Sequence, residues 1–151
     1  MDNAAQLRLF APVIKATAAY LVLFFTFMMF QSFSKFYLFA RAKAAAKKTD
    51  TEKPSLRQIK YASTSGLGFV SDRTFLNMLE QSPAFLTSLW MHAAFVSPAS
   101  AAQAGWVYIG FRALYPFVFS MGVPWLFIST FPNYGVVWYL AGTTLQAAMK
   151  A

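Results

Sequence analysis

Long apolar runs, separated by one polar and basic stretch, set the hydrophobic pattern of this sequence. A helix needs about 20 mainly apolar residues to cross a hydrocarbon core of roughly 30 Å. Four segments reach that length and predict membrane-spanning helices, at about residues 10–40, 74–96, 101–121 and 124–149. The connections after the second and third segments are short, so neighbouring helices are expected to be antiparallel. The pattern predicts an all-α, integral membrane four-helix bundle in which residues 1–151 form a single multi-pass domain.

Prolines inside two of these segments predict local irregularities. Pro132 lies within "FPNYG" and is expected to kink or split the fourth helix, so that its membrane-crossing part begins near Asn133. Pro116 cannot donate a hydrogen bond to the carbonyl of Arg112, four residues earlier. A kink and a free carbonyl are therefore expected beside this arginine.

The stretch from about residue 41 to 72 is predicted to be a loop on the cytosolic side, or its organellar equivalent. Eight of the thirteen lysines and arginines lie from here through Arg73, and basic loops stay on that side of a membrane. Both termini are then expected on the opposite side. The first residues of the stretch, "RAKAAAKK", are expected to extend the first helix beyond the bilayer, with lysines at the level of the lipid headgroups.

The composition supports membrane residence. The chain is 58% hydrophobic and only 12% charged, with a mean hydropathy of +0.45, so it has too few charges to cover a soluble globule. The net charge of +8 is explained by topology and by attraction to anionic headgroups. Nucleic acid is not an expected partner, because the aromatic residues lie in the membrane runs and not among the lysines. The host membrane is expected to be an endomembrane or organellar membrane.

The second predicted helix carries a polar stripe where a lipid-facing surface would be apolar. Its members are spaced i, i+4 and i+7 along one helix face, and they are Arg73, Asn77 and Glu80, with Gln81 beside them. Glu80 lies about 10 Å deeper than Arg73 along the helix axis. A lipid-facing carboxylate at that depth would be costly, so Glu80 is expected to point into the bundle or a cleft.

The third predicted helix carries a matching stripe with the same spacing: Tyr108, Arg112 and Tyr115. In an antiparallel pair the two stripes would meet at one level. One interpretation is structural, with a Glu80–Arg112 pair that fixes the register of the helices. The other is a site for an anionic or zwitterionic ligand, in which arginines bind carboxylates and Glu80 binds an ammonium group.

Other candidate chemistry is weak. His92 is the only histidine and lies toward the end of the second helix opposite the basic stretch, where a hydrogen bond made locally or at the interface is a better expectation than metal ligation. The chain has no cysteine, which excludes disulfides and cysteine-based zinc sites. No metal site is predicted.

Two segments, "RTFLNMLEQSPAFLTSLW" and "AGWVYIGFRALYP", together resemble the family of membrane-associated proteins in eicosanoid and glutathione metabolism, MAPEG. The resemblance implies a left-handed four-helix bundle that forms a homotrimer and binds glutathione between protomers near the cytosolic face. It also implies a lipophilic co-substrate that enters from the bilayer. Carried over by position, the residues that would contact glutathione are Arg73, Asn77, Glu80, Arg112 and Tyr115.

The chain also departs from the active members of this family. Gln81 and Phe119 stand where eicosanoid-making members have tyrosine, and Leu126 stands roughly where active members have the arginine that holds the glutathione thiolate. No basic residue lies between Arg112 and Lys150. In "STFPNYGVVWYL" the chain resembles microbial and algal members more than mammalian synthases.

The catalytic residue is therefore not assigned from the sequence, although Arg41 or Lys43 of a neighbouring protomer is a candidate. The expected function is glutathione binding, with conjugation or peroxide reduction of a lipophilic substrate. The alternative is a non-catalytic accessory subunit of a larger membrane complex, and a carrier or channel lined by Glu80 and Arg112 is a third option.

Overall fold

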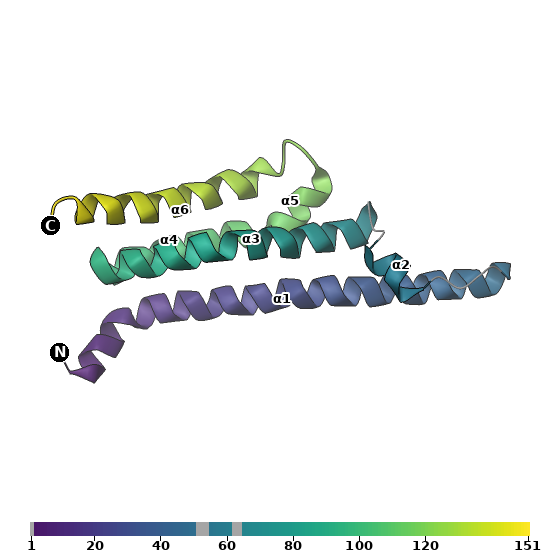
Figure 1. Cartoon of the computed structure of the whole chain (residues 1–151), viewed down its shortest axis with the longest axis horizontal. Helices are drawn as coiled ribbons and strands as arrows, with labels where there is room; N and C mark the ends of the chain where they lie inside the picture. Colours follow the sequence, from purple (N-terminus) through teal and green to yellow (C-terminus); the bar gives the residue numbers. More distant parts are fainter. Residues whose placement is uncertain (1, 51–54, 62–64) are drawn as a thin grey trace.

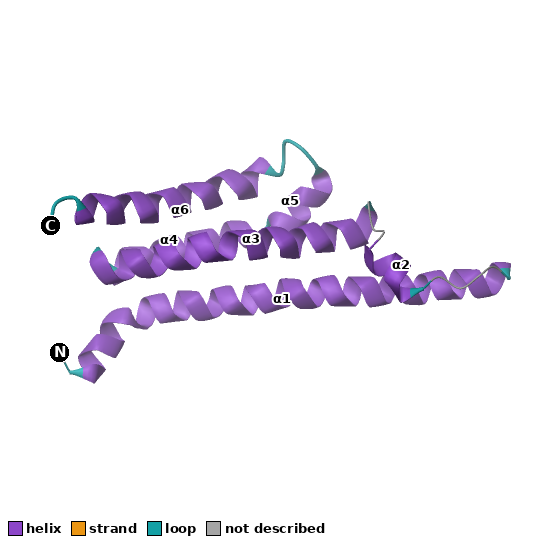
Figure 2. Ribbon diagram, viewed as in Figure 1, coloured by secondary structure: helices purple, strands orange, loops and turns teal. Residues whose placement is uncertain are grey.

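The computed structural model describes residues 2–50, 55–61 and 65–151. Within these ranges the chain is almost entirely helical and contains no strand (Figure 2). The helices are α1 (Asn3–Thr49), α2 (Leu56–Tyr61), α3 (Gly66–Phe95), α4 (Pro98–Ala113), α5 (Tyr115–Met121) and α6 (Phe127–Ala148). The prediction of an all-α bundle is confirmed, with α4 and α5 together corresponding to the third predicted helix.

Four long elements pack side by side. Helices α3 and α4 form the middle of the bundle, and α1 and α6 each pack against both of them (Figure 1). Helices α3 and α4 are antiparallel, and a short turn around Ser97 joins them. Both termini lie at one end of the bundle, and α2 lies at the other end (Figure 1). The described basic residues at the end of α1 and in α2 are therefore remote from both termini, as the charge pattern predicted.

The first helix extends to Thr49, well past the predicted end near residue 40. Alanine and lysine are strong helix formers, so "RAKAAAKK" continues α1 as expected. Asp50 then ends the helix in a left-handed conformation with φ of 50°. The prediction of a loop over residues 41–72 is wrong for the parts that lie in α1, α2 and the start of α3, while residues 51–54 and 62–64 lie outside the described part of the chain.

The two internal prolines behave differently. Helix α4 ends at Ala113 and α5 begins at Tyr115, which confirms the irregularity expected from Pro116. Helix α6 is continuous through Pro132, so the predicted split is wrong. One missing hydrogen bond inside a helix costs less than leaving several backbone groups unpaired in apolar surroundings.

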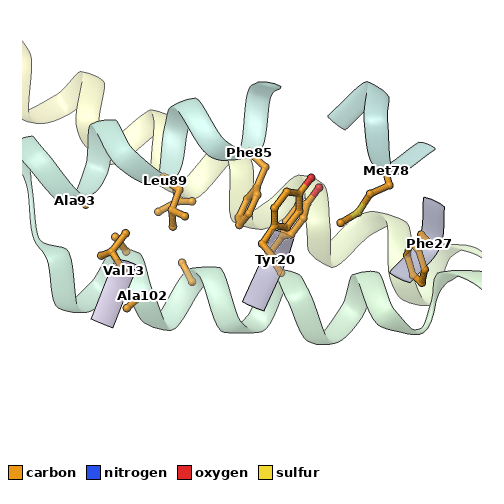
Figure 3. Packing of buried hydrophobic residues seen from close by; sticks show 12 residues of the cluster. Val13, Tyr20, Phe27, Met78, Phe85, Leu89, Ala93 and Ala102 are labelled. Atoms are coloured by element: carbon orange, nitrogen blue, oxygen red, sulfur yellow. The ribbon is translucent and has the colours of Figure 1, made fainter. Parts of the chain in front are cut away.

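Aromatic rings and small residues fill the core. Tyr20 of α1 packs on Phe85 with ring centroids 4.9 Å apart (Figure 3). The Phe85 ring also stacks on that of Tyr108, with centroids 3.7 Å apart. Gly105 lets α1 and α3 approach α4 closely, because a Cβ added there would lie 3.3 Å from both Ala16 and Leu89. These contacts fix the position of α4, which carries the central residue of the candidate site.

A test of length and apolar composition identifies one described helix that could cross a membrane, α1. Helix α4 is too short to cross a membrane by this criterion, because the break before α5 leaves it only 16 residues long. Helices α3 and α6 carry polar residues among their apolar ones. The prediction of four crossing helices is therefore not confirmed by this test.

Candidate functional site

Arg112 of α4 is the centre of a polar cluster inside the bundle. Its side chain is only 1% exposed. Nη1 donates a hydrogen bond to Asn77 Oδ1 of α3, and Nη2 donates to Gln81 Oε1 of the same helix. Nη2 also donates to the Tyr108 hydroxyl at 2.9 Å. The guanidinium is thus held by side chains from both middle helices.

Aromatic rings complete the surroundings of the guanidinium. The carbon atom Cζ of Arg112 lies 5.3 Å from the centre of the Tyr108 ring and 5.7 Å from that of Tyr115. Cations are attracted to the faces of such rings. The polar stripes of the second and third predicted helices therefore meet at one level, as their spacing predicted, with Asn77, Arg112 and Tyr115 brought together.

Glu80 does not join this cluster within one chain. Its side chain is exposed, and among the described residues no ion pair links it to Arg112. The structural interpretation of a Glu80–Arg112 pair is therefore wrong inside the single chain. The reason is rotational: each helical residue turns by about 100°, so Gln81, four residues after Asn77, lies closer to the Asn77 face than Glu80 does.

Arg73, the first residue of the polar stripe on α3, is half-buried. Both Arg73 and Glu80 lie near enough to the Tyr115 hydroxyl to interact with it electrostatically, as Arg112 also does. The Tyr115 ring thus lies among the three charged residues that the sequence singled out.

The positive charge of Arg112 is not balanced by a carboxylate within the described ranges. Its three hydrogen-bond acceptors are neutral, and its Nε atom is buried without a hydrogen-bond partner. A different pair joins α1 to α3, where Lys35 Nζ lies 2.6 Å from Asp72 Oδ2. Burying a cation without a counterion is costly, so this level of the bundle is electropositive and suited to an anionic group.

Helix α6 adds groups that the sequence analysis did not assign to the site. Gln81 Nε2 donates to the Tyr134 hydroxyl at 3.3 Å. The neighbouring Asn133 is fully buried, and neither polar atom of its side chain has a hydrogen-bond partner in the described structure. The i+4 spacing from Asn77 to Gln81 could have indicated the role of Gln81, but no local signal marked Tyr134.

An apolar cavity of about 1080 Å³ lies between α1, the start of α3 and α5. Phe119 forms part of its wall and also stacks on the Tyr115 ring with centroids 5.6 Å apart. The cavity is lined mainly by apolar side chains, among them Phe27, Phe30, Phe69 and Leu126. An apolar compartment and the polar cluster therefore share one aromatic wall.

His92 lies away from this cluster and is held by hydrogen bonds. One ring nitrogen lies 2.7 Å from the Ser100 hydroxyl and the other 2.9 Å from that of Thr143. The expectation of a hydrogen-bonded histidine is confirmed, although both bonds join α3 to other helices and neither is local. No group of three or more potential metal ligands occurs among the residues that the structure describes.

Comparison with known families decides the relationship. The sequence profile of the MAPEG family matches residues 17–146, which include the whole polar cluster from Arg73 to Tyr134. The chain belongs to the MAPEG family. MAPEG proteins are membrane-associated and generally bind glutathione as substrate or cofactor. A search of curated proteins gives no match for this MAPEG chain.

Proposed function

We propose that this MAPEG protein binds glutathione at the Arg112 cluster and uses it in conjugation to, or reduction of, a lipophilic substrate. The observation that carries the proposal is the buried Arg112 guanidinium, which is held by neutral acceptors only. Glutathione supplies the missing negative charge, since it carries two carboxylates and an ionisable thiol. Family membership supports the choice of this ligand over other anions.

Each predicted residue has a role that suits its chemistry. Arg73 and Arg112 bind the negatively charged groups, because a guanidinium presents a rigid set of donors. Glu80 binds the ammonium group, and its exposure leaves its oxygens available. Asn77 and Tyr115 donate or accept the remaining hydrogen bonds. The donor set therefore fits a zwitterionic peptide with a net negative charge.

The proposal includes a multi-pass homotrimer. An exposed glutamate in a lipid-facing position would be costly, and a neighbouring protomer would shield it from the acyl chains. Glutathione would then bind between protomers, with Glu80 contributed at the interface. The host membrane is proposed to be an endomembrane or organellar membrane, with the basic segment of α1 and α2 on its cytosolic side.

The lipophilic substrate is proposed to approach along the apolar cavity beside Tyr115. Phe119 lies in the wall of this cavity, and its ring stacks on that of Tyr115 in the polar cluster. A thiol bound near Tyr115 and an apolar substrate in the cavity would thus lie on adjacent sides of one site.

The test compares two carboxylate-to-amide variants in mild detergent. Glu80→Gln removes a charge from an exposed side chain, so the fold is expected to be unchanged while glutathione binding weakens about tenfold or more. Asp50→Asn is the matched control, since Asp50 is also exposed but lies at the end of α1, remote from the cluster. Calorimetric titration measures both. Equal affinity in Glu80→Gln and the control would contradict the proposal.

A second candidate is a non-catalytic accessory subunit of a larger membrane complex. The observation that favours it is the absence of any lysine or arginine between Arg112 and Lys150, where active members hold the thiolate. In that case the Arg112 cluster only joins α3 to α4. This candidate requires co-purification with other membrane proteins at a fixed stoichiometry, and a free oligomer in a mild-detergent native gel would contradict it.

A further inference from the structure

One series of hydrogen bonds leads from the Arg112 guanidinium toward α6, beside the bonds that Arg112 Nη1 and Gln81 Nε2 donate to Asn77 Oδ1 of α3. Arg112 Nη2 donates to Gln81 Oε1 directly and to the Tyr108 hydroxyl at 2.9 Å. Tyr108 in turn donates to Gln81 Oε1 at 3.4 Å. Gln81 Nε2 then donates to the Tyr134 hydroxyl at 3.3 Å. The chain of donors begins at a buried cation and ends at a tyrosine.

The orientation of the Gln81 amide follows from its neighbour. A guanidinium has donors only, so the amide oxygen of Gln81 must face Arg112 and its amino group must face away. The amino group can act only as a donor, and the Tyr134 hydroxyl oxygen accepts one of its hydrogen bonds. The direction of the chain is therefore imposed by Arg112.

The proton of the Tyr134 hydroxyl is left for another acceptor. No hydrogen bond donated by this hydroxyl occurs to any residue in the described ranges, and the side chain is 45% exposed. The adjacent Asn133 is fully buried with both polar atoms unpaired, so this turn of α6 presents unused polar groups on two residues. Unpaired buried polar groups are rare in proteins and indicate a bound water or ligand.

We propose that the Tyr134 hydroxyl donates a hydrogen bond to the thiolate sulfur of the bound thiol and so replaces the basic residue that this chain lacks after Arg112. The inference rests on the proposed function, because it requires glutathione in the Arg112 cluster. Gln81 and Tyr108 are positioning residues that transmit the polarisation of Arg112 to Tyr134. Phe119 lacks a hydroxyl, so Tyr134 supplies from α6 the group that the third predicted helix does not.

The physical basis is cooperative polarisation. A hydrogen bond from a cation draws electron density from its acceptor, and the acceptor then becomes a stronger donor in turn. In surroundings of low dielectric constant this effect is larger than in water. On ionisation the thiol proton leaves to the solvent and the S–H electron pair stays on sulfur. Tyr134 keeps its own proton and stabilises the negative sulfur through it.

The experiment compares Tyr134→Phe with the wild-type chain and with Tyr139→Phe, a control on the same helix. Tyr139 is exposed to a similar degree, and its ring packs on His92, remote from the cluster. Each protein in mild detergent is loaded with glutathione, and the ultraviolet absorbance of the thiolate is followed against pH. In Tyr134→Phe the pH at which half of the bound thiol is ionised should rise by about one to two units, while Tyr139→Phe should match the wild type.

The outcomes separate the two proposals. If wild-type protein binds no glutathione by calorimetry, the proposed function fails, and this inference fails with it. If wild-type protein binds glutathione but Tyr134→Phe ionises the bound thiol at the same pH, only this inference is overturned. A comparable rise in Tyr139→Phe would also overturn it, since the effect would then not depend on the chain of hydrogen bonds.

A second variant interrupts the chain one step earlier. Gln81→Leu leaves Tyr134 in place but removes its donor, so the half-ionisation pH should rise in this variant too. In the double variant with Tyr134→Phe the rise should not exceed that of Tyr134→Phe alone, because both changes act through one hydrogen bond to sulfur. Fully additive rises would show two independent effects and would contradict the transmission through Gln81.

Discussion

Gln81→Glu tests the charge balance around Arg112 most sharply. Glutamate has nearly the same shape as glutamine, so it would keep the contact with the guanidinium while adding the counterion that the described residues do not provide there. The substitution should therefore change stability and ligand affinity in opposite directions. The unliganded protein should become more stable, and an anionic ligand should bind more weakly, since the arginine would already be neutralised.

The expected magnitude follows from the type of hydrogen bond. A bond between neutral and charged groups becomes one between two charges, which is worth about 1 kcal/mol more after the cost of burying the new carboxylate is taken into account. For a chain of this size that gain raises Tm by about 2 to 4 °C. The loss of a charge-assisted contact with the ligand weakens glutathione binding by about ten- to hundredfold.

Thermal unfolding and calorimetric titration in the same detergent measure the two effects. Gln103→Glu is the matched control, because Gln103 is exposed on α4 and the same charge is added away from Arg112. General damage would lower both stability and affinity, whereas the charge argument requires them to change in opposite directions. A Gln81→Glu variant that binds glutathione as tightly as the wild type would refute the reasoning.

Two further predictions concern the bundle itself. His92→Ala removes a ring that joins α3 to α4 and α6 through two hydrogen bonds, so it should lower the unfolding free energy by about 1 to 3 kcal/mol in thermal unfolding. Its glutathione affinity should stay unchanged, and a loss of affinity would show that this end of the bundle is coupled to the site. Gly105→Val adds a branched side chain at a position where even a Cβ would lie only 3.3 Å from Ala16 and Leu89. It should lower the unfolding free energy by about 1 to 3 kcal/mol in the same assay. An unchanged Tm would mean that α1 is free to move away from α4.

The helical architecture and the level of the site could be predicted because both depend on periodicity. Apolar runs of membrane length gave the main helices, and the i, i+4, i+7 spacing correctly aligned Asn77 with Arg112 across an antiparallel pair. Side chains separated by whole turns must share a face whatever the tertiary details are. The end of α1 was harder, since good helix formers continue a helix beyond the bilayer as readily as within it.

The partner of Arg112 could not be predicted with the same reliability. Glu80 and Gln81 are adjacent, and the spacing from Asn77 favours Gln81 only slightly, by about 40° against about 60° around the helix axis. Charge complementarity favoured Glu80, but the packing of α3 against α4 turned Gln81 inward. Tyr134 was missed for another reason: it comes from α6, where Pro132 suggested an interrupted helix and no polar stripe drew attention.

The ability of the Arg112 cluster to bind an anionic thiol underlies both the proposed function and the proposed role of Tyr134. Calorimetric titration of glutathione into wild-type protein in mild detergent, repeated with Gln81→Glu, tests that claim in one experiment. We expect saturable binding in the wild type and binding about ten- to hundredfold weaker in the variant. No saturable binding in the wild type, or equal affinity in both proteins, would contradict it.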